Sequence, residues 1–226
     1  MVTCNAMKIH EVNFNLSFDS SEAIRVLKPS DAMLDECRAV STLLNGTMRG
    51  KSLIALYNDM EVGETSISLG GKCFECGSRI AGALKGAVSA AVFVATLGDK
   101  VTECYNRLQD SYDYLMAYWL DQLANVAVDR MLNHIRTGIS EMAAQSGMSI
   151  TSNWGPGYCR WPLSDQCQFI SLIPGAEKLV SLTDSMLMLP MKSLAGVIGI
   201  GYDVKYHVSG CSDCGLDYCF YRNQCR

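Results

Sequence analysis

The sequence predicts an α+β fold in which one domain spans residues 1–210 and a short cysteine-rich tail spans residues 211–226. Three observations predict it. Stretches with the alternating apolar and polar side chains of strands lie on both sides of one long helical stretch. No internal repeat and no low-complexity linker divides the chain, so one domain is the economical arrangement. At 226 residues with 49% hydrophobic content, the chain is long enough to bury a sizeable core.

Charge and hydropathy argue against two classes of partner. The net charge of −4 leaves no basic face to neutralise phosphates, so we expect no nucleic acid as a partner. The longest apolar run, residues 87–98, is too short to span a bilayer and better suits a buried strand. The N-terminus lacks the apolar core of a signal peptide. The sequence therefore predicts a cytoplasmic protein without a membrane partner.

The first hundred residues predict several strands with short helices between them. Residues 7–18 alternate as a half-buried strand does, and Ser30 after Pro29 is the predicted N-cap of a helix that runs to Asn45. The pattern then predicts strands at 52–60 and 64–70, a short helix at 77–86 and a buried strand at 87–97.

The longest predicted element is a helix from Asp99 to about Arg136, a stretch without proline or glycine. Apolar side chains recur every three or four residues and predict one buried face: Leu108, Tyr112, Leu115, Trp119, Leu123 and Val126. Three polar residues spaced four apart, Asp121, Asn125 and Asp129, share another part of the helix surface. That part either faces solvent or lines a ligand cleft.

The last third of the chain predicts a turn, a short helix and strands. The turn "GPGY" at residues 155–158 precedes a helix from Ser164 to Ile170, which Pro174 and Gly175 stop. Alternation between residues 178 and 208 predicts two or three strands. Within them, "GVIGIG" superficially matches a dinucleotide-binding glycine motif. Strand-like residues follow it where that motif needs a helix N-terminus, so we reject this interpretation.

Residues 152–166, "SNWGPGYCRWPLSDQ", show the strongest signs of a ligand loop. Pro156 fixes its φ angle, and the glycines beside it let another molecule approach the main chain, where free N–H and C=O groups would serve a polar ligand. Trp154, Tyr158 and Trp161 add aromatic faces for a flat or cationic ligand such as a sulfonium. The residues alone leave two interpretations open, a ligand loop and a structural turn.

The eleven cysteines fall into three groups. The scattered ones are expected to be inert core thiols: Cys4, Cys37, Cys104, Cys159 and Cys167. Cys73 and Cys76 form a C-x-x-C pair, which is a weak signal by itself. Four more crowd the tail with the spacing C-x2-C-x4-C-x5-C: Cys211, Cys214, Cys219 and Cys225. An odd total without an export signal indicates thiols or metal ligands rather than a disulfide framework.

The four tail cysteines predict a metal site. A C-x-x-C pair followed by glycine lets two thiolates reach one ion without strain, and four thiolates suit Zn²⁺ or an iron–sulfur cluster. Spacing alone does not choose between these metals. Free thiols and a disulfide are the remaining alternatives.

Four blocks of sequence, in order, carry a resemblance to a known family: "FVATLGDKV" (93–101), "LDQLANVAVDRMLNHI" (120–135), "GPGYCRWPLSDQ" (155–166) and "LTDSMLMLPMKSLAGVIGIG" (182–201). The sequence resembles the reactivation, or activation, domain of cobalamin (vitamin B12)-dependent methionine synthase, in its free-standing form. The resemblance covers most of residues 90–210. It implies a curved antiparallel sheet with the 99–136 helix packed on it.

The resemblance implies an accessory role in methyl transfer. The family's domain rescues a methionine synthase whose cobalamin has oxidised to inert cob(II)alamin. It presents S-adenosylmethionine for reductive methylation, while a one-electron donor such as flavodoxin or ferredoxin supplies the electron. The cobalamin belongs to the partner, either a methionine synthase module or another corrinoid protein. The domain contributes proximity and orientation, and none of its side chains acts as a nucleophile.

Carried onto this sequence, the resemblance implies a ligand site with these residues: Asn153, Gly157, Tyr158, Tyr206 and His207. Two positions depart from the family's pattern. An arginine of the ligand loop falls on Asn153, and an acidic ligand of the long helix falls on Asn125. Arginine can bind a carboxylate through two hydrogen bonds, whereas asparagine cannot. The ligand contacts are therefore rearranged in this chain, or S-adenosylmethionine is not bound.

Two alternatives to the methyl-donor role remain. In the first, the protein is a non-catalytic docking module that binds a corrinoid protein without S-adenosylmethionine. In the second, an iron–sulfur tail makes it an electron donor for a corrinoid methyltransferase, since reductive methylation needs one electron. Zinc in the tail would be structural.

Overall fold

A computed structural model describes residues 8–44 and 48–206 of the chain. Five strands form its central sheet: β1 (Lys8–Asn15), β2 (Arg49–Tyr57), β6 (Ser89–Thr96), β7 (Ser149–Trp154) and β10 (Ser193–Gly201). Their order across the sheet is β1-β2-β6-β10-β7, and every neighbouring pair is antiparallel. The predicted α+β fold with an antiparallel sheet is confirmed.

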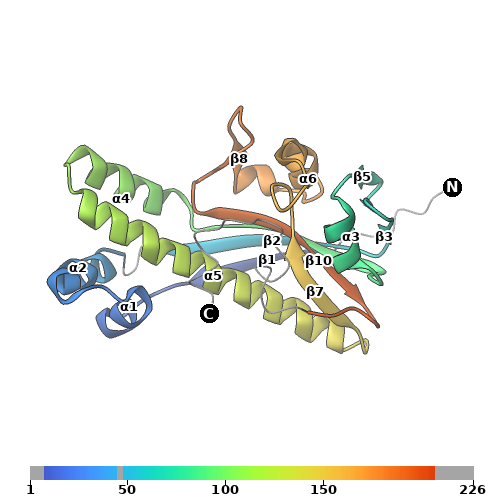
Figure 1. The fold of residues 1–226 in the computed structure, drawn as a ribbon, viewed down its shortest axis with the longest axis horizontal. Coiled ribbons are helices and arrows are strands. Elements are labelled where there is room, and N and C mark those ends of the chain that lie inside the picture. Colours follow the sequence, from blue (N-terminus) through green and yellow to red (C-terminus); the bar gives the residue numbers. More distant parts are fainter. Residues whose placement is uncertain (1–7, 45–47, 207–226) are drawn as a thin grey trace.

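Helices cover one face of the sheet (Figure 1). They are α1 (Ser20–Leu27), α2 (Leu34–Leu44), α4 (Asp99–Asp110) and α5 (Tyr114–Ala144). Helix α5 crosses the sheet diagonally, while α1, α2 and α4 gather at one end of the molecule (Figure 1). Within the described ranges, none of the helices combines the length and the apolar character that crossing a membrane requires.

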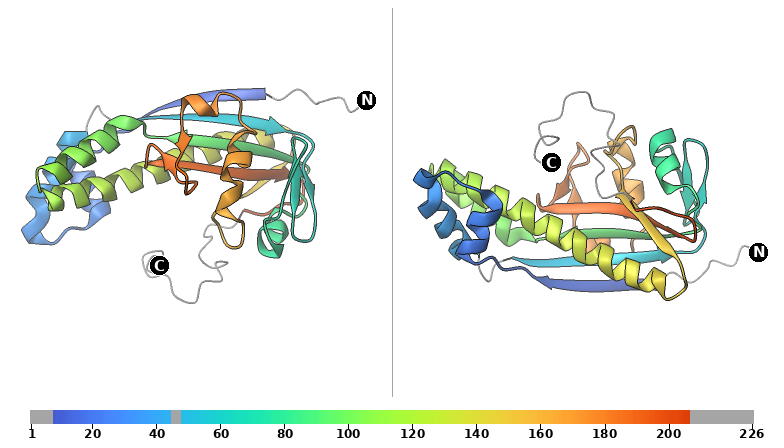
Figure 2. Two further views of the ribbon diagram at one scale, coloured as in Figure 1. Left: turned by 90° about the horizontal axis from the view of Figure 1, so that it is seen from above. Right: turned by 60° about the horizontal axis from the view of Figure 1, so that its bottom comes forward.

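The opposite face carries smaller elements, as the two views of Figure 2 show. The helices there are α3 (Ser78–Leu84) and α6 (Gln166–Ile170). A three-stranded sheet is built from β3 (Glu61–Val62), β4 (Ile67–Leu69) and β5 (Lys72–Phe74). A two-stranded hairpin is built from β8 (Ser181–Leu182) and β9 (Met188–Leu189). Short 3-10 turns at 31–33, 163–165 and 176–178 complete the fold.

Strand β6 explains the longest apolar run in the sequence. Phe93 and its alternate neighbours pack into the core beneath α5, whereas Val92 and Val94 pack into a second core on the other face. Side chains of a strand alternate between the two faces, and both faces are covered here. Every residue from 90 to 96 is therefore buried, which requires a continuous apolar sequence.

The predicted helix over residues 99–136 is two helices, and this prediction was wrong at one point. The chain breaks between α4 and α5 at Tyr112, which adopts a positive φ of 60°. Asp113 then caps α5 by accepting the N–H of Met116 at 3.2 Å. Neither proline nor glycine marks this break, so composition does not reveal it. At its other end α5 continues through Gly138 to Ala144.

The remaining predicted elements are confirmed with shifted bounds. Helix α1 and the strands β3, β5 and β7 were not predicted. The helix expected from Ser30 is a 3-10 turn followed by α2, and the Ser30 side chain makes no capping hydrogen bond. The strand expected at 64–70 contains only β4. The rejected glycine motif at 196–201 lies inside β10, in agreement with the interpretation as a strand.

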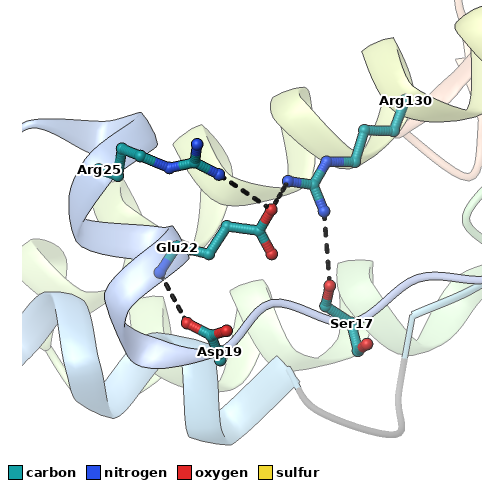
Figure 3. A network of polar contacts seen from close by, with 5 residues as sticks. All are labelled: Ser17, Asp19, Glu22, Arg25 and Arg130. Atoms are coloured by element: carbon teal, nitrogen blue, oxygen red, sulfur yellow. Dashed lines mark hydrogen bonds and ion pairs between the residues drawn. The ribbon is translucent and has the colours of Figure 1, made fainter.

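One arginine of α5 contacts α1 and the residues before it, and we call these contacts the Arg130 clasp: Ser17, Phe18, Glu22 and Arg130. Figure 3 shows the polar contacts of Arg130 with Ser17 and Glu22. Arg130 pairs with the carboxylate of Glu22, and its guanidinium lies 3.9 Å from the centroid of the Phe18 ring. Asp19 caps α1 by accepting the N–H of Glu22 at 2.7 Å. The clasp joins the N-terminal part of the chain to the middle of α5.

Candidate functional site

A strip of polar side chains runs along the outer side of α5. Its members are spaced three or four residues apart and so share one side of the helix: Asp121, Asn125, Asp129, Asn133 and Arg136. We call them the α5 polar strip. Buried residues such as Ala127 and Met131 occupy the side that faces the sheet. Three segments from the last third of the chain meet the strip, one near each end and one in the middle.

Lys192 meets the N-terminal end of the strip. It lies just before β10, two residues after the cis Leu189–Pro190 bond. Its ammonium nitrogen is 2.6 Å from Asp121 Oδ1 and donates to Asn125 Oδ1 at 2.6 Å. Asn125 Nδ2 also donates to Asp121 Oδ2 at 3.3 Å. The three side chains close a triangle in which the positive and negative charges compensate each other.

The GPGY turn lies within electrostatic range of the middle of the strip. Loss of hydration raises the pKa of the Tyr158 hydroxyl, and the charge of the Asp129 carboxylate raises it further. Partial desolvation also raises the pKa of Asp129, although this side chain keeps contact with solvent. Tyr158 is 49% exposed as a residue, and its ring packs edge-on against Trp154. An exposed ring beside a carboxylate suits a flat or cationic group.

The GPGY turn is held by its own hydrogen bonds. The N–H of Tyr158 donates to the carbonyl of Gly155 at 3.1 Å, and the N–H of Gly157 donates to the carbonyl of Trp161 at 2.9 Å. Gly157 has a φ of 91°, a conformation that favours glycine. The expectation of free N–H groups for a ligand is therefore wrong for Gly157 and Tyr158. The role of Gly157 in this geometry is to permit the turn.

The two tryptophans beside the turn belong to the core. Trp154 is 4% exposed and Trp161 is 2% exposed. Trp161 packs edge-on against Phe169 and donates its indole N–H to Asp165 Oδ2 at 3.0 Å. The prediction that both tryptophans offer a face to a ligand was wrong. They support the turn from below, and Tyr158 is the aromatic residue that reaches the surface.

A bulge in β7 turns Asn153 toward α5. Asn153 pairs with Ile198 and Ile150 pairs with Ile200, so two residues of β7 oppose a single residue of β10. The hydroxyl of Thr151 accepts the N–H of that residue at 2.9 Å and replaces the interrupted ladder. Since Ile198 and Ile200 both belong to the core beneath α5, Asn153 and Ile150 lie on the same side of the sheet as the helix.

Tyr206 meets the C-terminal end of the strip. The guanidinium of Arg136 lies 4.6 Å from the centroid of the Tyr206 ring and donates to its hydroxyl. Arg136 also donates to Asn133 Oδ1 at 2.8 Å. Here an open cavity of about 270 Å³ is lined by Arg136, Thr137, Ser140, Glu141, Ile150 and Tyr206. We call it the Arg136 cavity.

The structure thus brings three of the predicted ligand residues to one seam between α5 and β7, namely Asn153, Tyr158 and Tyr206. His207 lies outside the described residues. Asp129 and Arg136 belong to the same seam. Asp129 was one of the three polar residues for which the sequence left solvent and a ligand cleft open, whereas Arg136 was not predicted. Helical spacing contains the signal for Arg136, because a residue seven positions after Asp129 returns to within about 20° of the same direction.

The predicted metal ligands of the tail also lie outside the described residues: Cys211, Cys214, Cys219 and Cys225. Among the residues that the structure does describe, no group of three His, Cys, Asp or Glu side chains is placed to hold a metal ion. Cys73 is exposed and Cys76 is buried, and burial is the main cause that raises the pKa of Cys76 to about 11. This C-x-x-C pair therefore lacks the character of a reactive dithiol.

Of the four scattered cysteines that the structure describes, two are buried and two are exposed. Cys37 and Cys104 are buried, as predicted, and burial raises the pKa of both thiols. Cys159 and Cys167 are exposed, so the expectation of core thiols was wrong for them. Cys4 lies outside the described residues.

Comparison with known proteins bears on the fold. No protein-family model and no curated protein matches the sequence. A search of solved structures matches a crystal structure of the MetH reactivation domain bound to AdoHcy, with a TM-score of 0.51. The match covers 88% of this chain and 80% of that chain at 14% sequence identity. This protein has the reactivation-domain fold. The resemblance found in the sequence is thereby confirmed for the fold.

Proposed function

We propose that the protein is a free-standing reactivation module for a cobalamin-dependent methionine synthase and that it binds S-adenosylmethionine in the seam between α5 and β7. One observation carries the proposal. The residues that the resemblance implies as ligand contacts, Asn153, Tyr158 and Tyr206, lie along this one seam in a chain with the reactivation-domain fold. AdoHcy, bound in the solved reactivation domain, is S-adenosylhomocysteine, which S-adenosylmethionine becomes when it gives up its methyl group.

The middle of the seam fits the positive charge of a sulfonium. The ring of Tyr158 offers an aromatic face, and the carboxylate of Asp129 lies close enough to act on the Tyr158 hydroxyl. Both groups attract a cation that approaches from solvent. The core beneath the turn, with Trp154 and Trp161, holds Tyr158 in place.

The chain's own part in the reaction is to bind and orient the methyl donor. One electron from a donor protein and the methyl group of the sulfonium together convert cob(II)alamin of the partner into methylcobalamin, and S-adenosylhomocysteine is left. The reacting atoms belong to the ligand and to the partner's cobalamin. The contribution of this chain is therefore the proximity and the orientation that it gives to the methyl group.

A titration tests whether the seam binds the ligand. Isothermal titration with S-adenosylmethionine is carried out on the wild type, on Tyr158→Ala and on Tyr114→Ala, whose tyrosine is 56% exposed at the start of α5. We expect saturable binding to the wild type, a loss of about 10-fold in affinity for Tyr158→Ala, and no change for Tyr114→Ala. A folded wild type that binds no S-adenosylmethionine contradicts the proposal and leaves the docking module.

A second experiment tests the complete role. The protein is mixed anaerobically with a methionine synthase that lacks its own module, in the cob(II)alamin state, and with reduced flavodoxin. We expect the visible spectrum to change to that of methylcobalamin only when both S-adenosylmethionine and this protein are present. The spectrum of the protein alone tests the electron-donor alternative, since an iron–sulfur tail is coloured and a zinc-bound tail is not.

A further inference from the structure

We propose that the Arg136 cavity binds the amino-acid end of the S-adenosyl ligand, with Arg136 taking the carboxylate and Glu141 taking the ammonium group. This inference rests on the proposed function and goes further, because it assigns the ligand's carboxylate to a residue of α5. The resemblance implies an arginine at the position of Asn153 on β7, and asparagine cannot supply that contact.

The ion pairing along the strip favours Arg136 over Lys192 as the cation that binds a carboxylate. Lys192 is only 14% exposed and is paired with Asp121. The partners of Arg136 are neutral: the Tyr206 hydroxyl, the Tyr206 ring and the amide oxygen of Asn133. Among the described residues, no carboxylate lies within ion-pair distance of Arg136. The charge of Arg136 is therefore available to an anionic ligand group.

The cavity has the size and the lining for an amino-acid group. Its volume of about 270 Å³ is at the lower limit for sites that enclose a whole ligand, so it suits one end of a longer molecule. A guanidinium and the carboxylate of Glu141 lie on the same cavity, together with the hydroxyls of Thr137 and Ser140. Groups of opposite charge on one cavity match a zwitterion better than they match a simple anion.

The spacing along α5 places this cavity at a suitable distance from Asp129, whose charge acts on Tyr158. Along α5, Asp129 and Arg136 are seven residues apart, which corresponds to about 10.5 Å. A nucleoside joined to a short amino-acid chain spans a distance of this order. One ligand can therefore reach from the Tyr158 ring to Arg136.

Tyr206 and Asn133 hold the guanidinium before any ligand arrives. The Tyr206 ring supports the plane of the Arg136 fork, and Asn133 accepts one of its N–H groups. A fork that is already oriented loses less entropy when it binds a carboxylate through two hydrogen bonds. Tyr206 is then a positioning residue that acts through Arg136, which accounts for its place in the seam.

Two ligands that differ only at the amino-acid end test the proposal. Isothermal titration compares S-adenosylhomocysteine with 5′-methylthioadenosine, which has the nucleoside and the thioether but no amino-acid group. For Arg136→Gln we expect the affinity for S-adenosylhomocysteine to fall about 10- to 100-fold and that for 5′-methylthioadenosine to stay the same. For Glu141→Gln we expect a smaller loss of affinity for S-adenosylhomocysteine and again no change for 5′-methylthioadenosine. Arg25→Gln removes an arginine that is 77% exposed outside the strip and changes neither affinity.

Three outcomes overturn the proposal. If the wild type binds both ligands equally well, no residue recognises the amino-acid end. If Arg136→Gln weakens both ligands equally, Arg136 only supports the shape of the seam. If the wild type binds S-adenosylhomocysteine and a folded Arg136→Gln variant binds it equally well, Arg136 makes no contact with the ligand. A folded wild type that binds neither ligand contradicts the proposed function itself, and the inference falls with it.

Discussion

Helix α5 carries two arginines six residues apart, and their surroundings differ in one respect. Each lies over an aromatic ring, Arg130 over Phe18 at 3.9 Å and Arg136 over Tyr206 at 4.6 Å. Arg130 is paired with the carboxylate of Glu22, in a contact that joins two parts of the chain (Figure 3). No carboxylate is paired with Arg136 in the part of the chain that the structure describes.

This difference separates a contact that stabilises the fold from one that we propose for a ligand. Both charges of the Arg130 clasp are compensated by each other, and the Phe18 ring beneath is fully buried. At the Arg136 cavity, a half-buried ring and a neutral amide orient the cation without neutralising it. A charge that the fold leaves uncompensated at an open cavity is a candidate for binding. The clasp should therefore determine stability, and the cavity should determine affinity.

The largest expected effect on the free energy of unfolding comes from removing the two rings that lie against the arginines, those of Phe18 and Tyr206. Phe18→Ala empties a fully buried site and should lower the free energy of unfolding by about 3–5 kcal/mol. Tyr206→Ala removes a ring at the edge of an open cavity and should cost less than about 1 kcal/mol. Urea denaturation of both variants measures the two values. Equal losses would show that the Tyr206 ring is as much a part of the core as Phe18.

Replacement of the arginines themselves should give the next largest effect on the free energy of unfolding. Arg130→Met leaves the carboxylate of Glu22, 26% exposed, with the exposed Arg25 at 3.5 Å as its remaining ion-pair partner. We expect a loss of about 1–2 kcal/mol in the free energy of unfolding, from the ion pair and the cation–π contact together.

Arg136→Met is the matched variant and should change the free energy of unfolding by less than about 0.5 kcal/mol. Conversely, Arg130→Met should bind S-adenosylhomocysteine as tightly as the wild type does at a temperature where both are folded. A loss of stability in Arg136→Met as large as that in Arg130→Met would remove the distinction between the two regions.

The fold could be predicted from the sequence wherever a repeated pattern carried it. The alternating segments gave the strands, and the unbroken apolar run from 87 to 98 identified the central strand, β6. The break between α4 and α5 was missed because it depends on a positive φ at Tyr112, a residue for which that conformation is unusual. Helix α1 was missed although its start carries a local signal, since Asp19 accepts the N–H of Glu22 as an N-cap does.

The site was predictable only in part, because burial and charge pairing depend on segments that are distant in the sequence. The resemblance named Asn153, Tyr158 and Tyr206, and the structure places them on one seam. The tryptophans were assigned to the ligand because sequence does not show whether an aromatic ring faces solvent or core. Arg136 was missed because its significance depends on which charges lack a partner. Pairing across the fold is known only when distant segments are placed side by side.

Lys192 offers a further test of the comparison, with a smaller effect. Like Arg130 in the clasp, Lys192 is paired with a carboxylate, that of Asp121. Asp121 is 34% exposed, so solvent screens this ion pair. A double-mutant cycle with Lys192→Met and Asp121→Asn should give a coupling of about 0.5–1 kcal/mol in the free energy of unfolding, smaller in high salt. A coupling near zero would mean that Lys192 is not held by Asp121, and Lys192 would then compete with Arg136 as the cation that binds the ligand.

The smallest expected effect is a pH dependence of stability that comes from Asp129 on the strip. Unlike Glu22 in the clasp, Asp129 has no ion-pair partner among the described residues. Desolvation raises the pKa of Asp129 above its usual value, so the folded protein holds this proton more tightly than the unfolded chain does. Stability therefore falls as the pH rises from about 4 through the folded pKa, and the penalty is complete above that pKa. Asp129→Asn removes the charge and with it the penalty. The variant should be slightly more stable than the wild type near neutral pH and equal to it below about pH 4 in urea denaturation. A difference that does not change with pH would mean that folding does not shift the pKa of Asp129, and the strip would then lack the desolvated charge on which its proposed role in cation binding depends.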